Sequence, residues 1–200
     1  MSEIKQQFNY MLMDKFQLED LADRKLYINT EIDECITDDI IYHILRFNTE
    51  DKDKKLENRK PILLYCTSNG GSIADGFGLI DVILASKTPV YTINLAYQYS
   101  MGFLIGLAGT KRFATKNATF LMHDGQNFAY NSTSKLRDQM KFCEQQEQRI
   151  KDYILSKSNL TSEEYNDKLR VEWYLYANSA KEKGFTDFII GEDCSIDEII

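Results

Sequence analysis

Two side chains with catalytic potential, Ser100 and His123, each lie near the end of an apolar run that predicts a buried strand. Ser100 opens the apolar helical segment 100–109, so its hydroxyl would lie beside the free N–H groups and positive dipole of a helix N-terminus. That setting suits a serine nucleophile, and an N-cap serine equally well. His123 ends the run 119–123, where a neutral imidazole is a candidate general base. A half-exposed histidine without a catalytic role is the alternative.

The glycine pair Gly70-Gly71 follows the apolar run 62–68 and is the third feature with chemical potential. Paired glycines permit positive φ and close backbone approach, so their N–H groups could face an oxyanion or a phosphate. An ordinary strand-to-helix turn is the alternative. The chain has neither the GxGxxG spacing of dinucleotide-binding proteins nor the GxxxxGK[ST] of a nucleotide phosphate loop.

A serine–histidine pair also requires a carboxylate that orients the imidazole ring and stabilises its protonated form. Several acidic residues lie in loops or element ends where they could approach such a pair. On sequence alone the choice stays open among four of them: Asp124, Asp167, Glu172 and Asp187.

The segments that must position these residues alternate between strand and helix patterns. We expect strands over 25–30, 62–68, 90–95, 112–115, 119–123, 173–177 and 185–190, and helices over 38–47, 72–87, 100–109, 134–158, from 161 onward and over 179–184. This alternation predicts an α/β fold with a mostly parallel sheet. In such sheets functional groups gather at the carboxyl ends of strands, where Gly71, Ser100 and His123 would all lie. The charged run 49–60 predicts a solvated loop.

The length and charge of the chain restrict its partners. Its 200 residues correspond to one domain, and 24 basic against 31 acidic side chains give a net charge of −7. An acidic chain without a basic run is a poor binder of nucleic acid or anionic membranes. The longest apolar stretch, 93–109, is shorter than the roughly 20 residues of a membrane span and contains polar side chains.

The cysteines and the N-terminal stretch indicate the compartment. The four cysteines form no CxxC pair, which argues against a zinc site or a disulfide framework and favours reduced, buried thiols: Cys35, Cys66, Cys143 and Cys194. The first 25 residues are charged throughout and lack the apolar core of a signal peptide. We therefore expect a cytoplasmic protein.

Together these features resemble the proteolytic subunits of the Clp protease family of serine peptidases, over roughly residues 18–190. No single motif is decisive, but their order and spacing agree. The family's SPGGS, ASMG, M-x-H, AG…KRF and GLVD motifs correspond here to Ser68-Asn69-Gly70-Gly71-Ser72, Tyr99-Ser100-Met101-Gly102, Leu121-Met122-His123, residues 108–113 and Gly184-Phe185-Thr186-Asp187.

The resemblance implies a crotonase-like ββα-superhelix in one domain spanning residues 1–200, with an N-terminal segment at 1–20. It also implies a protruding handle made of a strand and a long helix, which residues 124–158 would form. In this family Ser100 would be the nucleophile and His123 the general base. The N–H groups of Gly71 and Met101 would form the oxyanion hole, and neither a metal nor a cofactor would be required.

The acid of the implied triad departs from the family pattern. The family has Asp where this chain has Glu172, one methylene longer, and Asp167 is the alternative acid. Val171 replaces a family arginine, and the bulky Tyr97-Gln98-Tyr99 replaces small residues before the nucleophile. These differences concern the site and the assembly, and they do not affect the expected fold.

The resemblance also implies partners. Family members form homo-oligomeric heptameric rings, which stack into tetradecamers and receive unfolded polypeptides from a separate AAA+ unfoldase, the only component that uses ATP. Two alternatives stay open: a catalytically weak or inactive ring or scaffold paralogue, suggested by Val171 and Glu172, and another crotonase-fold enzyme acting on acyl-CoA. The acyl-CoA enzymes use backbone oxyanion holes with carboxylate bases and do not need Ser100 and His123 at these positions.

Overall fold

The computed structural model describes residues 15–125 and 132–200, and its larger sheet is entirely parallel. Short apolar runs separated by helices form such a sheet because each crossover returns the chain in the same direction. The expected α/β architecture with a mostly parallel sheet is confirmed. The strand order is β1 (Lys25–Ile28), β2 (Ile62–Cys66), β3 (Val90–Asn94), β5 (Lys111–Thr115) and β8 (Phe188–Ile190).

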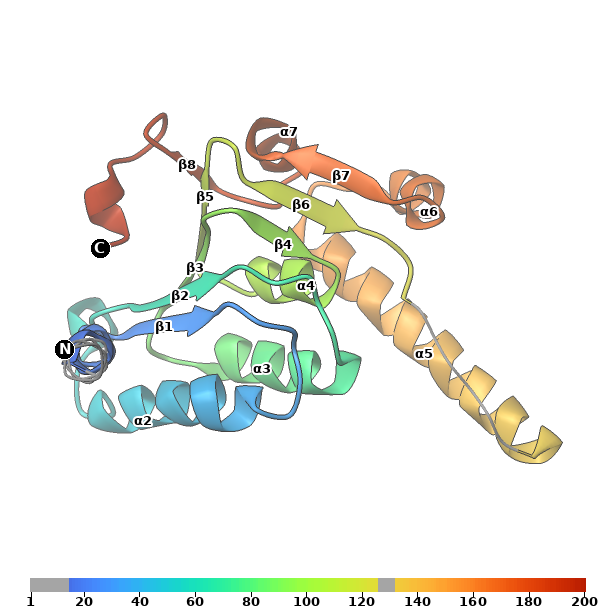
Figure 1. Cartoon of the computed structure of the whole chain (residues 1–200), viewed down its shortest axis with the longest axis horizontal. Coiled ribbons are helices and arrows are strands. Elements are labelled where there is room, and N and C mark those ends of the chain that lie inside the picture. The colour runs from blue at the N-terminus through green and yellow to red at the C-terminus, as the bar shows by residue number, and fades with distance from the viewer. Residues whose placement is uncertain (1–14, 126–131) are drawn as a thin grey trace, which may run out of the picture.

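A smaller sheet contains β4 (Tyr97–Tyr99), β6 (Thr119–Met122) and β7 (Trp173–Tyr176), in that order. β4 runs parallel to β6, whereas β7 runs antiparallel to it, as Figure 1 shows. Sequence analysis missed β4, because three residues are too few to show an alternating pattern. The last strand is also shorter than the expected 185–190, since it begins at Phe188.

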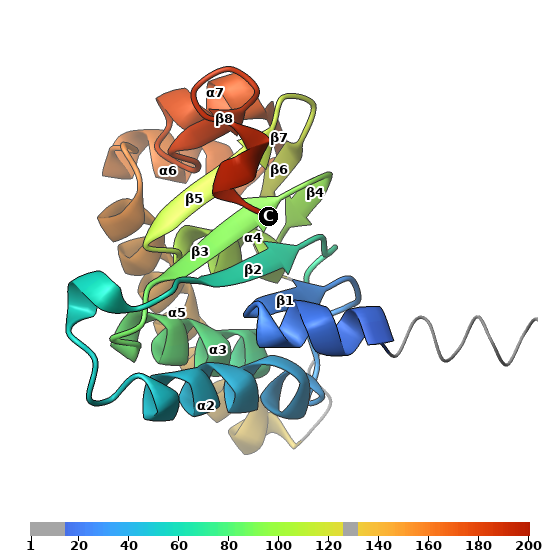
Figure 2. The same ribbon diagram turned by 90° about the vertical axis from the view of Figure 1, so that its left-hand side faces the viewer.

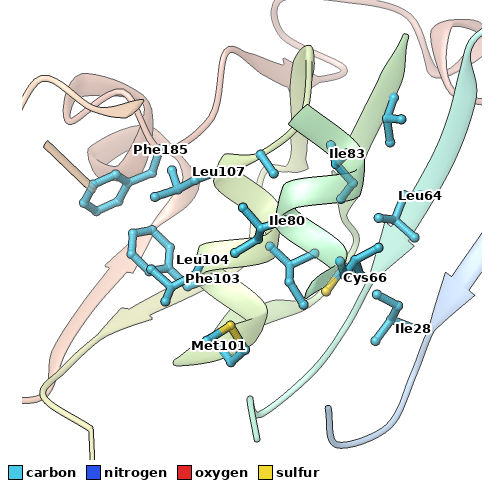
Figure 3. Close-up of a cluster of buried hydrophobic side chains, with 14 of the residues drawn as sticks. Ile28, Leu64, Cys66, Ile80, Ile83, Met101, Phe103, Leu104, Leu107 and Phe185 are labelled. Atoms are coloured by element: carbon cyan, nitrogen blue, oxygen red, sulfur yellow. The ribbon is translucent and has the colours of Figure 1, made fainter. Parts of the chain in front are cut away.

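Helices cover one face of the larger sheet and form the main core with it. Figure 3 shows side chains of α3 (Ile80, Ile83), α4 (Met101, Phe103) and the sheet (Leu64) in this one cluster. Every residue of α4 is buried, so this helix is apolar on all sides. The helical elements are a π-helical turn (Thr37–Ile41), α2 (Tyr42–Glu50), α3 (Ile73–Ala85), α4 (Met101–Leu107), α5 (Thr133–Lys157), α6 (Ser162–Leu169) and α7 (Ala177–Glu182), with 3-10 turns at Leu56–Asn58 and Ile196–Glu198.

The C-terminal segment covers part of the opposite face of the larger sheet (Figure 2). Ile199 packs there in a second apolar cluster with Tyr65, Ile93 and Phe113. The middle of the sheet is therefore buried on both sides, which explains why all five residues of β2 are buried, whereas Tyr27 of the edge strand β1 is exposed.

The long helix α5 projects away from the body of the molecule (Figure 1). Its only buried residue among those described is Ile154, near its C-terminal end, while Met140 and Phe142 are exposed. The helix agrees with the expected 134–158. The strand that would complete the predicted handle falls mainly on residues 126–131, which lie outside the described residues.

Two sequence-based expectations are wrong in part. The run 49–60 is not simply a solvated loop, because α2 continues to Glu50 and Asp51 is fully buried. Of the four cysteines, all free, Cys66 is buried but Cys35 is exposed and the other two are half-buried. Burial raises the pKa of the Cys66 thiol to about 12, so it stays protonated. Within the described ranges, no helix combines the length and apolar character needed to cross a membrane.

Asp51 is buried because it neutralises the buried Arg24. Arg24 Nη2 donates to Asp51 Oδ1 at 2.8 Å, and Thr88 Oγ1 donates to Asp51 Oδ2 at 3.0 Å. The hydrogen bond from Arg24 holds the pKa of the Asp51 carboxyl well below its usual range. The pair joins the start of β1 to the end of α2 across 27 positions of sequence.

We expect Asp51→Ala to lower the free energy of unfolding by about 3–5 kcal/mol, because it leaves Arg24 buried without its partner. The difference in stability between the variant and the wild type should be largest above about pH 4–5. It should shrink at lower pH, because Asp51 of the unfolded wild type takes up a proton there and the wild type becomes less stable. Urea denaturation at several pH values measures both effects. Asp53→Ala, at an exposed acid nearby, is the control and should change stability by less than about 0.5 kcal/mol. A loss of the same size in both variants would contradict the role of the pair.

Candidate active site

Ser100 occupies a strained backbone conformation at the turn from β4 into α4. Its φ of 53° and ψ of −121° lie in a region that favours glycine, and its side chain makes no capping hydrogen bond. Ser100 therefore stands at the N-cap position of α4, but the capping role considered for its side chain is wrong. Its N–H donates to the Leu121 carbonyl at 3.1 Å, which attaches the turn to β6. Strained residues of this kind concentrate at functional sites, where the surrounding structure holds them in place.

The glycine loop after β2 lies directly against this serine. Ser68 pairs with Gln98 of β4, which brings Gly70 beside the turn. A Cβ on Gly70 would lie 2.6 Å from Ser100 Cβ and 3.0 Å from the Met101 nitrogen. Only glycine fits at such a distance, and the φ of 105° also requires it. The loop is thus more than an ordinary strand-to-helix turn.

Two backbone N–H groups near Ser100 have no obligatory partner. Met101 is the first residue of α4, so its N–H has no acceptor within the helix. At Gly71, the Ile32 N–H donates to the Gly70 carbonyl and the Ser72 N–H donates to the Ile32 carbonyl. In this bridge the N–H of the middle residue, Gly71, points away from Ile32. Both donors are therefore available to a ligand.

His123 and Glu172 face each other across the antiparallel strands β6 and β7. The register pairs Leu121 with Tyr174 and Met122 with Trp173, so the next pair is His123 with Glu172. Side chains directly opposite in such a pair lie on the same face of the sheet. The distance from His123 Nδ1 to Glu172 Oε1 is 3.9 Å, and the Glu172 side chain is 63% exposed.

The order of strands in the smaller sheet explains how three distant residues meet. Ser100 follows β4 and His123 follows the parallel strand β6, so both lie at the edge where these strands end. Glu172 directly precedes β7, which begins at that same edge because it runs in the opposite direction (Figure 1). Serine, imidazole and carboxylate therefore follow one another across neighbouring strands.

A cavity of about 290 Å³ lies beside this edge, with both Ser100 and His123 in its wall. Most of the wall beyond them is apolar, with side chains from α4, α5 and α6 such as Leu104, Ile150 and Leu169. Burial, together with the charges of Glu147 and Asp124, raises the pKa of Tyr165 in this wall to about 12, so its hydroxyl stays neutral. The cavity can hold an apolar side chain next to the serine hydroxyl.

The match to a known family decides what this arrangement is. The sequence matches the Clp protease family over residues 9–193. The chain belongs to the Clp protease family. The resemblance and the fold expected from the motifs are confirmed by this match.

Curated relatives of the Clp-family chain agree with the assignment. The ATP-dependent Clp protease proteolytic subunit 2 of Treponema pallidum (strain Nichols) is 26% identical over 172 residues, covering 85% of this chain and 83% of the relative. The ATP-dependent Clp protease proteolytic subunit of Lactococcus lactis subsp. cremoris (strain SK11) is 28% identical over 175 residues, covering 85% and 84%. The chain is thus a serine-type peptidase of the Clp family, and the alternative of an acyl-CoA enzyme is not favoured.

The structure also places the other candidate acids. Asp187 binds Arg112, with Arg112 Nε donating to its Oδ2 at 3.1 Å, and so holds β5 and the segment before β8 together. Asp167 is exposed on α6 and does not line the cavity, whereas Asp124 lines it beside His123 in the chain. Of the four carboxylates, Glu172 is the one that lies close to a His123 ring nitrogen, with Oε1 3.9 Å from Nδ1. Within the described part of the chain, no cluster of histidine, cysteine or acidic side chains could hold a metal ion.

Sequence analysis assigned no role to one residue of this edge, Tyr174. Its hydroxyl donates to Glu172 Oε2 at 2.9 Å. The signal was present in the spacing, because residues two apart on a strand share a face. This spacing becomes informative only once the register of β7, which brings Glu172 opposite His123, is known.

We expect Gly70→Ala to destabilise the protein by about 1–3 kcal/mol, because the new methyl group collides with Ser100 and the residue must keep a positive φ. Gly78→Ala is the matched control: in α3 its Cβ would meet only Ile41 Cδ1 at 4.0 Å, so it should stabilise by about 0.5–1 kcal/mol. Urea unfolding of both variants measures the contrast. Equal effects in the two variants would show that Gly70 is not closely packed against the serine.

Proposed function

We propose that the chain is the proteolytic subunit of a self-compartmentalised ring protease that cleaves peptides and unfolded polypeptides, with Ser100, His123 and Glu172 as its catalytic residues. The observation that carries this proposal is the convergence of these three residues at one edge of the smaller sheet, beside a cavity. A serine, an imidazole and a carboxylate make up the triad of many serine peptidases, whatever their order in the sequence.

The proposed chemistry is acyl transfer through a covalent intermediate. Ser100 Oγ attacks the carbonyl carbon of the scissile peptide while His123 accepts the hydroxyl proton. The carbonyl oxygen becomes an oxyanion that the N–H groups of Gly71 and Met101 stabilise, at about 3–4 kcal/mol per donor. The tetrahedral intermediate then expels the amine, which takes the proton from His123 and leaves an ester on Ser100. Water then attacks the ester carbonyl while His123 takes its proton. The bond between Ser100 Oγ and the acyl carbon breaks, the product leaves as a carboxylic acid, and His123 returns the proton to Ser100.

Glu172 would hold the imidazole ring and stabilise its protonated form. Its Oε1 is 3.9 Å from the His123 Nδ1 in this structure, a distance that shortens readily because catalytic hydrogen bonds are often loose without substrate. A glutamate performs this role in principle as well as an aspartate, since either carboxylate can accept the Nδ1 hydrogen. Asp167 would replace it only if α6 moved.

We propose a homo-oligomeric assembly, a heptameric ring that stacks into a tetradecamer, as its working form. The projecting helix α5 supports this, because Met140 and Phe142 are 63% and 59% exposed on a helix with little cover of its own. Together with residues 124–132, this helix would form the handle of a single domain that spans residues 1–200. Apolar side chains on an isolated arm are typical of a surface buried between subunits.

A separate AAA+ unfoldase would deliver polypeptides and would be the only component that uses ATP. The sequence has no nucleotide phosphate motif of its own, so in this proposal ATP use falls to the partner. The relatives from Treponema pallidum and Lactococcus lactis are named as ATP-dependent subunits. We propose a cytoplasmic location, without nucleic-acid or membrane partners and without a bound cofactor, in line with the net charge of −7.

We expect the assembled protein to hydrolyse short fluorogenic peptides and to react covalently with a fluorophosphonate probe at Ser100. Ser100→Ala should abolish both reactions, because the nucleophile is lost. Ser179→Ala, at an exposed serine on α7, is the control and should leave both unchanged. An assembled wild-type ring that neither hydrolyses peptide nor takes the label would favour the inactive or scaffold alternative.

Comparison of Glu172→Ala with Asp167→Ala identifies the acid. We expect Glu172→Ala to lower kcat for peptide hydrolysis at least about 100-fold, since the imidazole loses its orienting partner. Asp167→Ala should retain near wild-type kcat because its side chain is exposed away from the cavity. Steady-state kinetics on the assembled variants measures the difference, and the reverse pattern would assign the role to Asp167.

A further inference from the structure

Tyr174 contacts the proposed catalytic acid directly. Its hydroxyl donates to Glu172 Oε2 at 2.9 Å, while the other oxygen, Oε1, is the one nearest His123. We propose that Tyr174 is a positioning residue that holds the Glu172 side chain toward His123. This inference rests on the proposed function and adds a residue to its site.

The strand dictates this contact. Glu172 immediately precedes β7 and Tyr174 is its second residue, so the two side chains lie on the same face, two positions apart. One oxygen of the Glu172 carboxylate accepts the hydrogen bond from the phenol, and the other oxygen faces the imidazole. The same hydrogen bond raises the pKa of Tyr174, so its hydroxyl remains a donor at neutral pH.

Glu172 needs such a partner because it is long and exposed. A glutamate has one more rotatable bond than an aspartate, and 63% of this side chain is open to solvent. A freely rotating carboxylate would spend much of its time away from His123. Small displacements of a catalytic group cost large factors in rate, so fixing one oxygen keeps the other in the useful position.

Tyr174 is itself held by the residue before the nucleophile. Its ring packs edge-to-face on Tyr99 with centroids 5.6 Å apart, and the Tyr99 hydroxyl is hydrogen-bonded to Thr119 Oγ1 at 2.8 Å. Tyr99 and Glu172 are two positions at which this sequence differs from the family pattern. Both residues contact Tyr174, so we infer that the bulky Tyr99 and the longer acid act together.

The test is Tyr174→Phe in the assembled protein, which keeps the ring contact with Tyr99 and removes the hydroxyl. We expect kcat for a fluorogenic peptide to fall about three- to tenfold with KM unchanged, because only the positioning of the acid is affected. Tyr176→Phe is the matched control on the same strand: its side chain is exposed, its hydroxyl bonds to none of the residues that the structure describes, and its kcat should stay at the wild-type value.

A double-mutant comparison separates positioning from a merely structural role. In a Glu172→Ala background, Tyr174→Phe should cause no further loss, because there is no carboxylate left to position. The same three- to tenfold loss with and without Glu172 would overturn the inference, and so would an unchanged kcat in Tyr174→Phe alone.

Crystal structures of the wild type and Tyr174→Phe give a readout that does not depend on hydrolysis. We expect the Glu172 carboxylate to turn away from His123 in the variant. If it stays at the 3.9 Å separation found here, the inference is wrong. A wild-type protein without Ser100-dependent hydrolysis would instead refute the proposed function. The crystallographic comparison would still decide the role of Tyr174.

Discussion

The site depends on the backbone pairing of β6 with a strand on each side. β6 is parallel to β4 and antiparallel to β7, so one edge of this small sheet receives the end of two strands and the start of a third. A slip of one residue in either pairing would turn the side chains of that strand to the opposite face. The register therefore decides whether Ser100, His123 and Glu172 meet at all.

Hydrogen bonds and close packing hold the strained turn at Ser100 in its conformation. The Ser100 N–H is bound to the Leu121 carbonyl, its own carbonyl accepts from the Leu104 N–H at 3.2 Å, and Gly70 packs against its side chain. A positive φ at a serine costs about 1–3 kcal/mol, which these contacts and the buried helix α4 offset. The result is a hydroxyl held at the mouth of an apolar cavity.

Two departures from the family pattern, Tyr99 and Glu172, both contact Tyr174. Tyr99, Tyr174 and Glu172 contact one another in series along the smaller sheet, from the residue before Ser100 to the carboxylate that faces His123. Substitutions that touch in this way are best understood together. In the proposed site, the larger residue before Ser100 packs against the tyrosine that donates to the longer acid.

The sequence by itself determined the elements and the candidates whose signals are local. The apolar run of β2, the capping of α6 by Thr161, and the positions of Ser100 and His123 after strands were all evident from neighbouring residues. Only the tertiary structure decided which of four carboxylates faces His123, and that the strained Ser100 makes no side-chain cap. It also decided that Asp51 is buried with Arg24 and that β4 exists. These features depend on residues tens of positions apart, and the distances between them are set by strand register and packing, which no local pattern encodes.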